Sequence, residues 1–310
     1  MHTPAPVRAD RTLAAILLSL LALTLFALMA LIVKHLSPRY DPEELSAYRN
    51  LFALIPAVVA LYATPAWHAA GRPWIIRQWK LGLFRGSFII FAQYMFYTAL
   101  ALIPFATATT ISNANALFMT ALAVPLLKER VGPVRWGAVL IGFVGVILVT
   151  RPGSDSFQWA ALLPVGAAFL YALNGVTARL MDPDVPSPLL NIYASGTSAV
   201  GGVIFALALG GFTPIASWTD LGWIVLMGTL GGLAVLCVVV SFRMAEQADL
   251  APFTYFAIPI SFALGWIFYR EAPVEDLFPG ALLIIAGGLL IVWRERQKSR
   301  RPVVPEPPET

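Results

Sequence analysis

The sequence has 310 residues, of which 58% are apolar and only 12% charged, and its formal net charge is +4. Soluble domains carry about 25% charged residues, so this composition excludes an ordinary soluble protein and favours one surrounded by lipid. The basic residues are scattered along the chain, which argues against a nucleic-acid partner, and a single cysteine, Cys237, excludes an intrachain disulfide.

Runs of about 20 mainly apolar residues, the length that a membrane-spanning helix requires, recur along the chain. They predict an all-α polytopic membrane protein with ten transmembrane helices. The predicted spans are residues 12–33, 45–63, 80–101, 104–127, 133–150, 158–180, 188–210, 218–241, 250–269 and 274–293. The first span is too long for the apolar core of a signal peptide and is predicted to be retained.

The basic residues also indicate an orientation, because Lys and Arg in short loops favour the cytoplasm. If the N-terminus is inside, 15 of the 21 lie in cytoplasmic segments and 4 on the opposite side, and the other two, Arg49 and Arg85, lie within spans. We therefore expect a multi-pass protein of the bacterial inner membrane with both termini cytoplasmic. Residues 1–11 are the predicted N-terminal segment, and residues 294–310 are predicted to be a disordered tail.

The two halves of the chain share a register at an offset of 142 residues. The matched positions include Gly86 and Gly228, Ala121-Leu122 and Ala263-Leu264, and Lys128-Glu129 and Arg270-Glu271. This register predicts repeats over residues 12–150 and 158–293, joined by a linker at residues 151–157. Each half has five helices, an odd number, so the halves must cross the membrane in opposite senses. Inverted repeats of this kind hold their binding site near the bilayer midplane.

A charged motif closes the fourth span, a glycine-rich span follows it, and both recur in the second half. The residues are Leu127 to Arg130, Trp136 to Gly145, and their echoes Tyr269 to Glu271 and Gly280 to Gly288. Together with Arg49 and with Leu83 to Gly86, they resemble the drug/metabolite transporter superfamily, specifically transporters with two EamA-type domains. The resemblance implies ten helices, cytoplasmic termini, and a central cavity that moves small organic solutes by alternating access.

Four residues are predicted to have structural or gating roles: Arg49, Glu129, Pro259 and Glu271. The two glutamates end matched spans, where they either cap helices or form a gate salt bridge, and capping is favoured. The fourth span has Leu117 where the ninth has Pro259, so a kink is expected in the second half only.

None of the 17 carboxylates and three histidines lies in the middle of a span. The sequence therefore indicates no catalytic residue, metal site, cofactor or proton relay. Arg85 within a span either contacts substrate or snorkels to the headgroups, and the polar fourth span either lines a cavity or wedges between helices. The candidate substrate-binding residues are Arg85, Gln93, Tyr94, Tyr97, Asn113, Asn115, Tyr171, Asn174 and Tyr255.

Together these features predict an inner-membrane secondary transporter, an exporter or facilitator of amino acids or related compounds. Export rests on the family resemblance alone. An importer of a vitamin or nucleoside-like metabolite such as riboflavin or S-adenosylmethionine is the alternative. A membrane-embedded enzyme or scaffold is a different class, which the lack of clustered His, Asp and Glu disfavours. The expected partners are a small-molecule substrate and membrane lipid, and a monomer is compatible with the sequence.

Overall fold

The computed structural model describes residues 8–129, 131–152, 158–182, 184–245, 247–271 and 273–299. Within those ranges the chain forms helices and no strand. The helices are α1 (Arg8–Leu36), α2 (Pro42–Tyr62), α3 (Pro65–Ala69), α4 (Trp79–Leu102), α5 (Phe105–Ser112), α6 (Asn115–Leu127), α7 (Pro133–Thr150), η1 (Trp159–Ala161), α8 (Leu162–Ala178), α9 (Ser187–Leu209), α10 (Trp218–Met244), α11 (Gln247–Thr254), α12 (Ala257–Tyr269), α13 (Val274–Leu277) and α14 (Gly280–Ser299).

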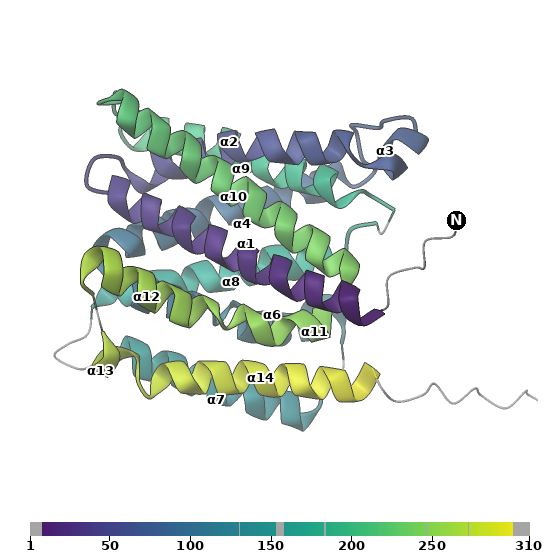
Figure 1. Cartoon of the computed structure of the whole chain (residues 1–310), viewed down its shortest axis with the longest axis vertical. Coiled ribbons are helices and arrows are strands. Elements are labelled where there is room, and N and C mark those ends of the chain that lie inside the picture. The colour runs from purple at the N-terminus through teal and green to yellow at the C-terminus, as the bar shows by residue number, and fades with distance from the viewer. Residues whose placement is uncertain are drawn as a thin grey trace, which may run out of the picture.

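The long helices lie side by side in one bundle (Figure 1). The start of α1 and the end of α14 lie at the same end of the bundle, on the right of the figure, which we name the terminal end. The opposite end, where α1 leads into α2, is named the α1–α2 end.

Eight helical segments of the described chain are long and apolar enough to cross a membrane, from Thr12–Leu36 to Pro252–Tyr269. Their outward side chains are apolar: on α9, for example, Val200, Ile204 and Leu207 are each more than 60% exposed. Such a surface is stable in hydrocarbon and costly in water. The prediction of a multi-span, all-helical membrane protein is confirmed, whereas the count of ten stays a prediction because it also includes α4 and α14.

The fourth and ninth predicted spans are each broken into two helices. The bounds of α5 and α6 recur in α11 and α12, 142 residues later. Lys128 and Arg270, which end α6 and α12, both have left-handed backbone, with φ of 56° and 59°. The two halves thus share this local geometry.

The expectation of a kink in the second half only is wrong. The first-half break needs no proline, because Asn113 ends α5 with its own groups: its backbone N–H and its side-chain Nδ2 both donate to the Thr109 carbonyl. Pro259 lies in the first turn of α12, where a missing N–H disturbs no helical hydrogen bond.

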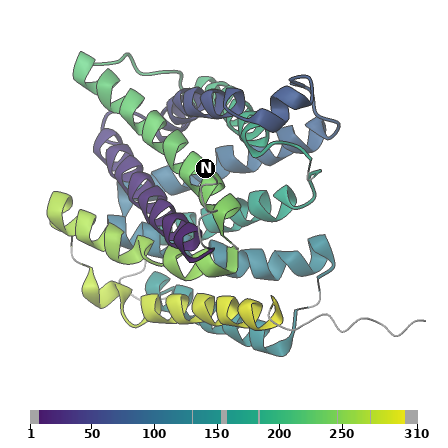
Figure 2. The ribbon, with the colours of Figure 1, turned by 45° about the vertical axis from the view of Figure 1, so that its right-hand side comes forward.

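Helices α7 and α14 pair along one side of the bundle (Figure 2). Glycines bring their backbones together: a Cβ added at Gly287 would lie 2.6 Å from the Ala138 carbonyl, and one at Gly145 would lie 2.6 Å from the Gly280 carbonyl. Helix α14 continues to Ser299, so residues 294–299, predicted to be disordered, are helical here. They are Arg, Glu, Gln, Lys and Ser, most of them good helix formers. The rest of the predicted tail lies outside the described residues.

Candidate functional site

A cavity of about 680 Å³ lies among the helices of both halves. Its walls come from α1, α2, α4, α5, α6, α8, α9, α10 and α12. One wall of the cavity lies toward the terminal end. It is formed by α8 (from Tyr171 to Ala178), α9 (from Leu190 to Ser195) and α10 (from Val235 to Val239). Sites for small organic ligands have volumes of about 300–1,000 Å³, so this cavity is large enough for a metabolite.

Six of the nine predicted substrate-binding residues line this cavity: Arg85, Gln93, Tyr97, Asn115, Tyr171 and Asn174. The other three do not. The ring of Tyr94 packs edge-on against Phe205 of α9, with the ring centres 5.1 Å apart. Asn113 caps α5, and Tyr255 points to α14, where a Cβ at Gly288 would overlap its hydroxyl.

Six buried polar atoms of the lining have no hydrogen-bond partner within the described chain. They are Arg49 Nε, Arg85 Nη1, Tyr97 OH, Ser112 Oγ, Asn115 Oδ1 and Asn174 Oδ1. A buried polar group left without a partner costs about 1–3 kcal/mol. Six of them around one cavity are therefore suited to hydrogen-bond a polar ligand, with donors, acceptors and hydroxyls all represented.

Arg49 is held in place by neutral amides. Its Nη1 donates to Asn50 Oδ1 at 2.9 Å. Gln93 Oε1 in turn accepts from both Asn50 Nδ2 and Ser46 Oγ at 2.6 Å, and all four residues are buried. Gln93, a predicted substrate-binding residue, lines the cavity, and its amide also bonds Asn50, the partner of Arg49. Asn50 and Ser46 were missed, although their i, i+4 spacing beside Arg49 is a recognisable signal.

Arg85, the second arginine of the cavity, is anchored to α8. Its Nε donates to the Asn174 carbonyl of α8 at 3.3 Å, and the residue is 7% exposed. Arg49 is equally buried at 7%. Side chains that snorkel to the headgroups would be exposed at a helix end. Both guanidinium groups lie inside the bundle instead.

The charged side chains that line the cavity in the described chain are both positive. Arg49 and Arg85 are its only charged lining residues in the described chain, and no carboxylate lines it. Within the described chain neither arginine forms a salt bridge, whereas Lys34, Arg39 and Arg179 each have an acidic partner. The cavity therefore presents positive charge to whatever enters it.

An ion pair joins three parts of the chain at the α1–α2 end. Lys34 Nζ lies 2.7 Å from Glu271 Oε1 and also donates to the Ile103 carbonyl at 3.1 Å. Glu271 Oε2 accepts from the backbone N–H of Phe105 at 2.8 Å. We call these four residues the Lys34–Glu271 cluster. It ties α1 to the α4–α5 turn and to the end of α12.

A second cluster closes the same end nearby. Asp220 of α10 accepts from Arg39 Nη1 at 2.7 Å and from the Tyr40 hydroxyl at 3.0 Å. That hydroxyl also accepts from the N–H of Ala216. The loop after α1 is thus bound to the start of α10.

Glu129 forms an ion pair with Arg179, which links the end of α6 to the end of α8. Glu129 and Glu271 were both favoured as helix caps, but each carboxylate instead bonds a residue far away in sequence. Their backbone N–H groups complete the turns that end α6 and α12.

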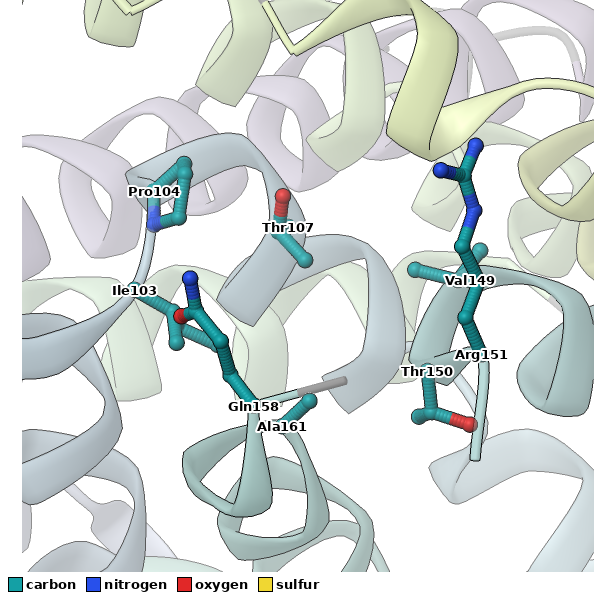
Figure 3. Close-up of a pocket in the computed structure, with 8 residues that line it drawn as sticks. All are labelled: Ile103, Pro104, Thr107, Val149, Thr150, Arg151, Gln158 and Ala161. Carbon is teal, nitrogen blue, oxygen red and sulfur yellow. The ribbon is translucent and has the colours of Figure 1, made fainter. Parts of the chain in front are cut away.

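A smaller cavity of about 220 Å³ lies at the α1–α2 end (Figure 3). Thr107 and Gln158 lie on one side of it, and Val149 to Arg151 lie on the other. The charged residue that lines it, Arg151, donates to the Glu275 carbonyl. The larger cavity is therefore the candidate binding site.

Known proteins with similar sequences are transporters. A riboflavin transporter from Rhizobium johnstonii is 31% identical over 66% of this chain and 67% of its own. An S-adenosylmethionine uptake transporter from Rickettsia bellii is 27% identical over 85% and 88%. A pseudopaline exporter from Pseudomonas aeruginosa is 23% identical over 91% and 95%.

A crystal structure that is 18% identical superposes with a TM-score of 0.63 over 92% of this chain and 98% of its own, which shows the fold alone. The model of the EamA-like transporter family matches residues 13–151 and 158–293. Every residue that lines the larger cavity falls within these two matches. The chain belongs to the EamA-like transporter family.

Proposed function

We propose that this protein is an uptake transporter for a vitamin or nucleoside-like metabolite, such as riboflavin or S-adenosylmethionine. The observation that carries the proposal is the cavity of about 680 Å³ with its six unpartnered polar atoms. Aromatic rings of Phe26, Phe96 and Tyr171 line it as well. Rings stack on flat heteroaromatic solutes, and the polar atoms bond their edges.

The relatives favour this alternative over the export of amino acids that the sequence alone suggested. Both a riboflavin transporter and an uptake transporter for S-adenosylmethionine match at 27% identity or more. The relative named as an exporter matches at 23%. Export of a polar metabolite remains the second candidate because that match extends over 91% of this chain.

The proposed mechanism is alternating access between two inverted repeats, residues 12–150 and 158–293. The recurring bounds of α5–α6 and α11–α12 support the repeats. The Lys34–Glu271 cluster supports a state closed at the α1–α2 end, with the cavity extending toward the terminal end. The proposal includes ten spans in a bacterial inner membrane, and the excess of basic residues at the terminal end supports cytoplasmic termini.

Flux in proteoliposomes tests the function. Purified protein is reconstituted, and uptake and counterflow of radiolabelled riboflavin, S-adenosylmethionine and amino acids are measured with and without pH and sodium gradients. We expect saturable flux of riboflavin or S-adenosylmethionine. Flux of amino acids alone would restore the prediction of an amino-acid transporter. No flux from folded protein would refute transport of these solutes.

A matched pair of variants ties the flux to the cavity. The Tyr97 hydroxyl faces the cavity without a partner, so Tyr97→Phe leaves no new unpaired group in the fold. We expect it to raise KM about three- to tenfold, the worth of one hydrogen bond. Tyr94→Phe, on the same helix but outside the cavity, is expected to leave KM unchanged. Equal effects of the two substitutions would contradict the assignment of the site.

A further inference from the structure

We propose that Arg49 and Arg85 make the cavity a charge filter, which admits uncharged or anionic solutes rich in hydrogen-bond acceptors and rejects net cations. This inference rests on the proposed function and narrows its substrate class. It assigns the selective step to two buried guanidinium groups in a cavity that no described carboxylate lines.

Within the described chain, no carboxylate neutralises the positive charge of Arg49 or Arg85. The hydrogen-bond partners of Arg49 and Arg85 are the neutral Asn50 amide and the Asn174 carbonyl. A buried cation bonded only to neutral groups acts on nearby solutes more strongly than an exposed one, because less water screens it. A solute that bears negative charge or carbonyl oxygens lowers the energy of both guanidinium groups, whereas a cation raises it.

Neighbouring amides fix the direction of the Arg49 side chain. The Asn50–Gln93 pair leaves Nη1 engaged and Nε without a partner. A Cβ added at Gly231 of α10 would lie 2.8 Å from Nε, so the guanidinium packs closely against that helix. Asn50 and Gln93 are therefore positioning residues, and the free donor of Arg49 is the group that they present.

The two substrates named among the relatives differ in net charge. Riboflavin is uncharged, and its ring carries two carbonyl oxygens and ring nitrogens that accept hydrogen bonds. S-adenosylmethionine carries a permanent sulfonium charge in addition to its amino and carboxylate groups, so it is a net cation. The filter therefore favours a flavin-like solute over S-adenosylmethionine in this chain.

The experiment compares two ligands that differ only by a methyl group and its charge. S-adenosylhomocysteine lacks the sulfonium methyl of S-adenosylmethionine and is net neutral. Equilibrium binding of each, and of riboflavin, is measured on purified protein in detergent. We expect S-adenosylhomocysteine to bind at least about tenfold more tightly than S-adenosylmethionine. The repulsion of a unit charge about 8 Å from one guanidinium, at an effective dielectric of about 20, corresponds to about 30-fold in affinity.

Variants then attribute the preference to the two arginines. Arg85→Gln is expected to reduce the ratio of the two affinities severalfold. Asn115→Asp is a second variant of nearly unchanged shape, which adds a carboxylate to the cavity lining and is expected to reduce the ratio further. The matched control is Lys80→Gln, which removes a positive charge from an exposed position of the same helix as Arg85 and is expected to leave the ratio unchanged.

Binding is measured apart from flux, so the two proposals fail separately. Preferential binding of the neutral ligand without flux of any solute supports the filter and overturns the transport proposal. Equal or tighter binding of S-adenosylmethionine, or binding of neither adenosyl ligand nor riboflavin, overturns the filter. So does a ratio that Arg85→Gln and Asn115→Asp both leave unchanged in folded protein.

Discussion

Glu271→Gln tests the gate that we propose at the α1–α2 end. Glu271 accepts two hydrogen bonds there, one from Lys34 and one from Phe105, and the Lys34 and Glu271 side chains are 12% and 26% exposed. The substitution keeps the shape of the side chain and removes its charge. Because the cluster ties α1 to α12 and to the α4–α5 turn, we expect the closed state at this end to be destabilised relative to the state open there.

The size of the effect follows from the geometry. Two unit charges 2.7 Å apart attract by about 6 kcal/mol at an effective dielectric of about 20, and desolvation of both groups offsets much of it. A hydrogen bond between charged groups stabilises by about 1.5–3 kcal/mol net. Taking about 2 kcal/mol, the equilibrium shifts about 25-fold toward the state that is open at the α1–α2 end.

Cysteine labelling measures this shift. Cys237 is replaced by alanine, and Ala30, which lines the cavity from α1 and is 3% exposed, is replaced by cysteine. A membrane-impermeant maleimide is added on the α1–α2 side of oriented vesicles. We expect labelling to accelerate at least about tenfold in Glu271→Gln, and not in Glu275→Gln, an exposed glutamate at the same end. Identical labelling rates with and without Glu271→Gln, in folded protein, would refute the gate.

Three further outcomes are expected. Lys34→Gln should accelerate the same labelling, and the double variant with Glu271→Gln should add little to the larger single effect, since both remove one interaction; additive effects would show that the two residues act separately. Gly287→Ala should lower the thermal unfolding temperature in detergent, because its Cβ would press on the Ala138 carbonyl and cost about 1–3 kcal/mol. Gly137→Ala, which meets nothing within 4 Å, is its control and should not destabilise. Tyr40→Phe should destabilise by about 1–3 kcal/mol in the same assay, because it leaves Asp220 and the Ala216 N–H short of a partner, and an unchanged unfolding temperature would contradict that role.

The sequence by itself determined the class of the protein and the position of most helices. Lipid as a solvent requires apolar residues over a whole span, so hydropathy carries that information locally. The same local signal located the charged turns at Lys128 and Arg270, which end matched helices. It also ranked Arg85, Tyr97, Asn115 and Asn174 among the cavity candidates, because polar groups in hydrocarbon are costly.

Only the tertiary structure decided which of those polar groups meet. Tyr94 and Tyr97 are neighbours on α4, yet one packs on α9 and the other lines the cavity. Lys34 and Glu271 are 237 residues apart, and no local pattern pairs them. Hydropathy reports the cost of placing each residue in lipid, whereas a binding site depends on distances between side chains of different helices, which packing alone sets.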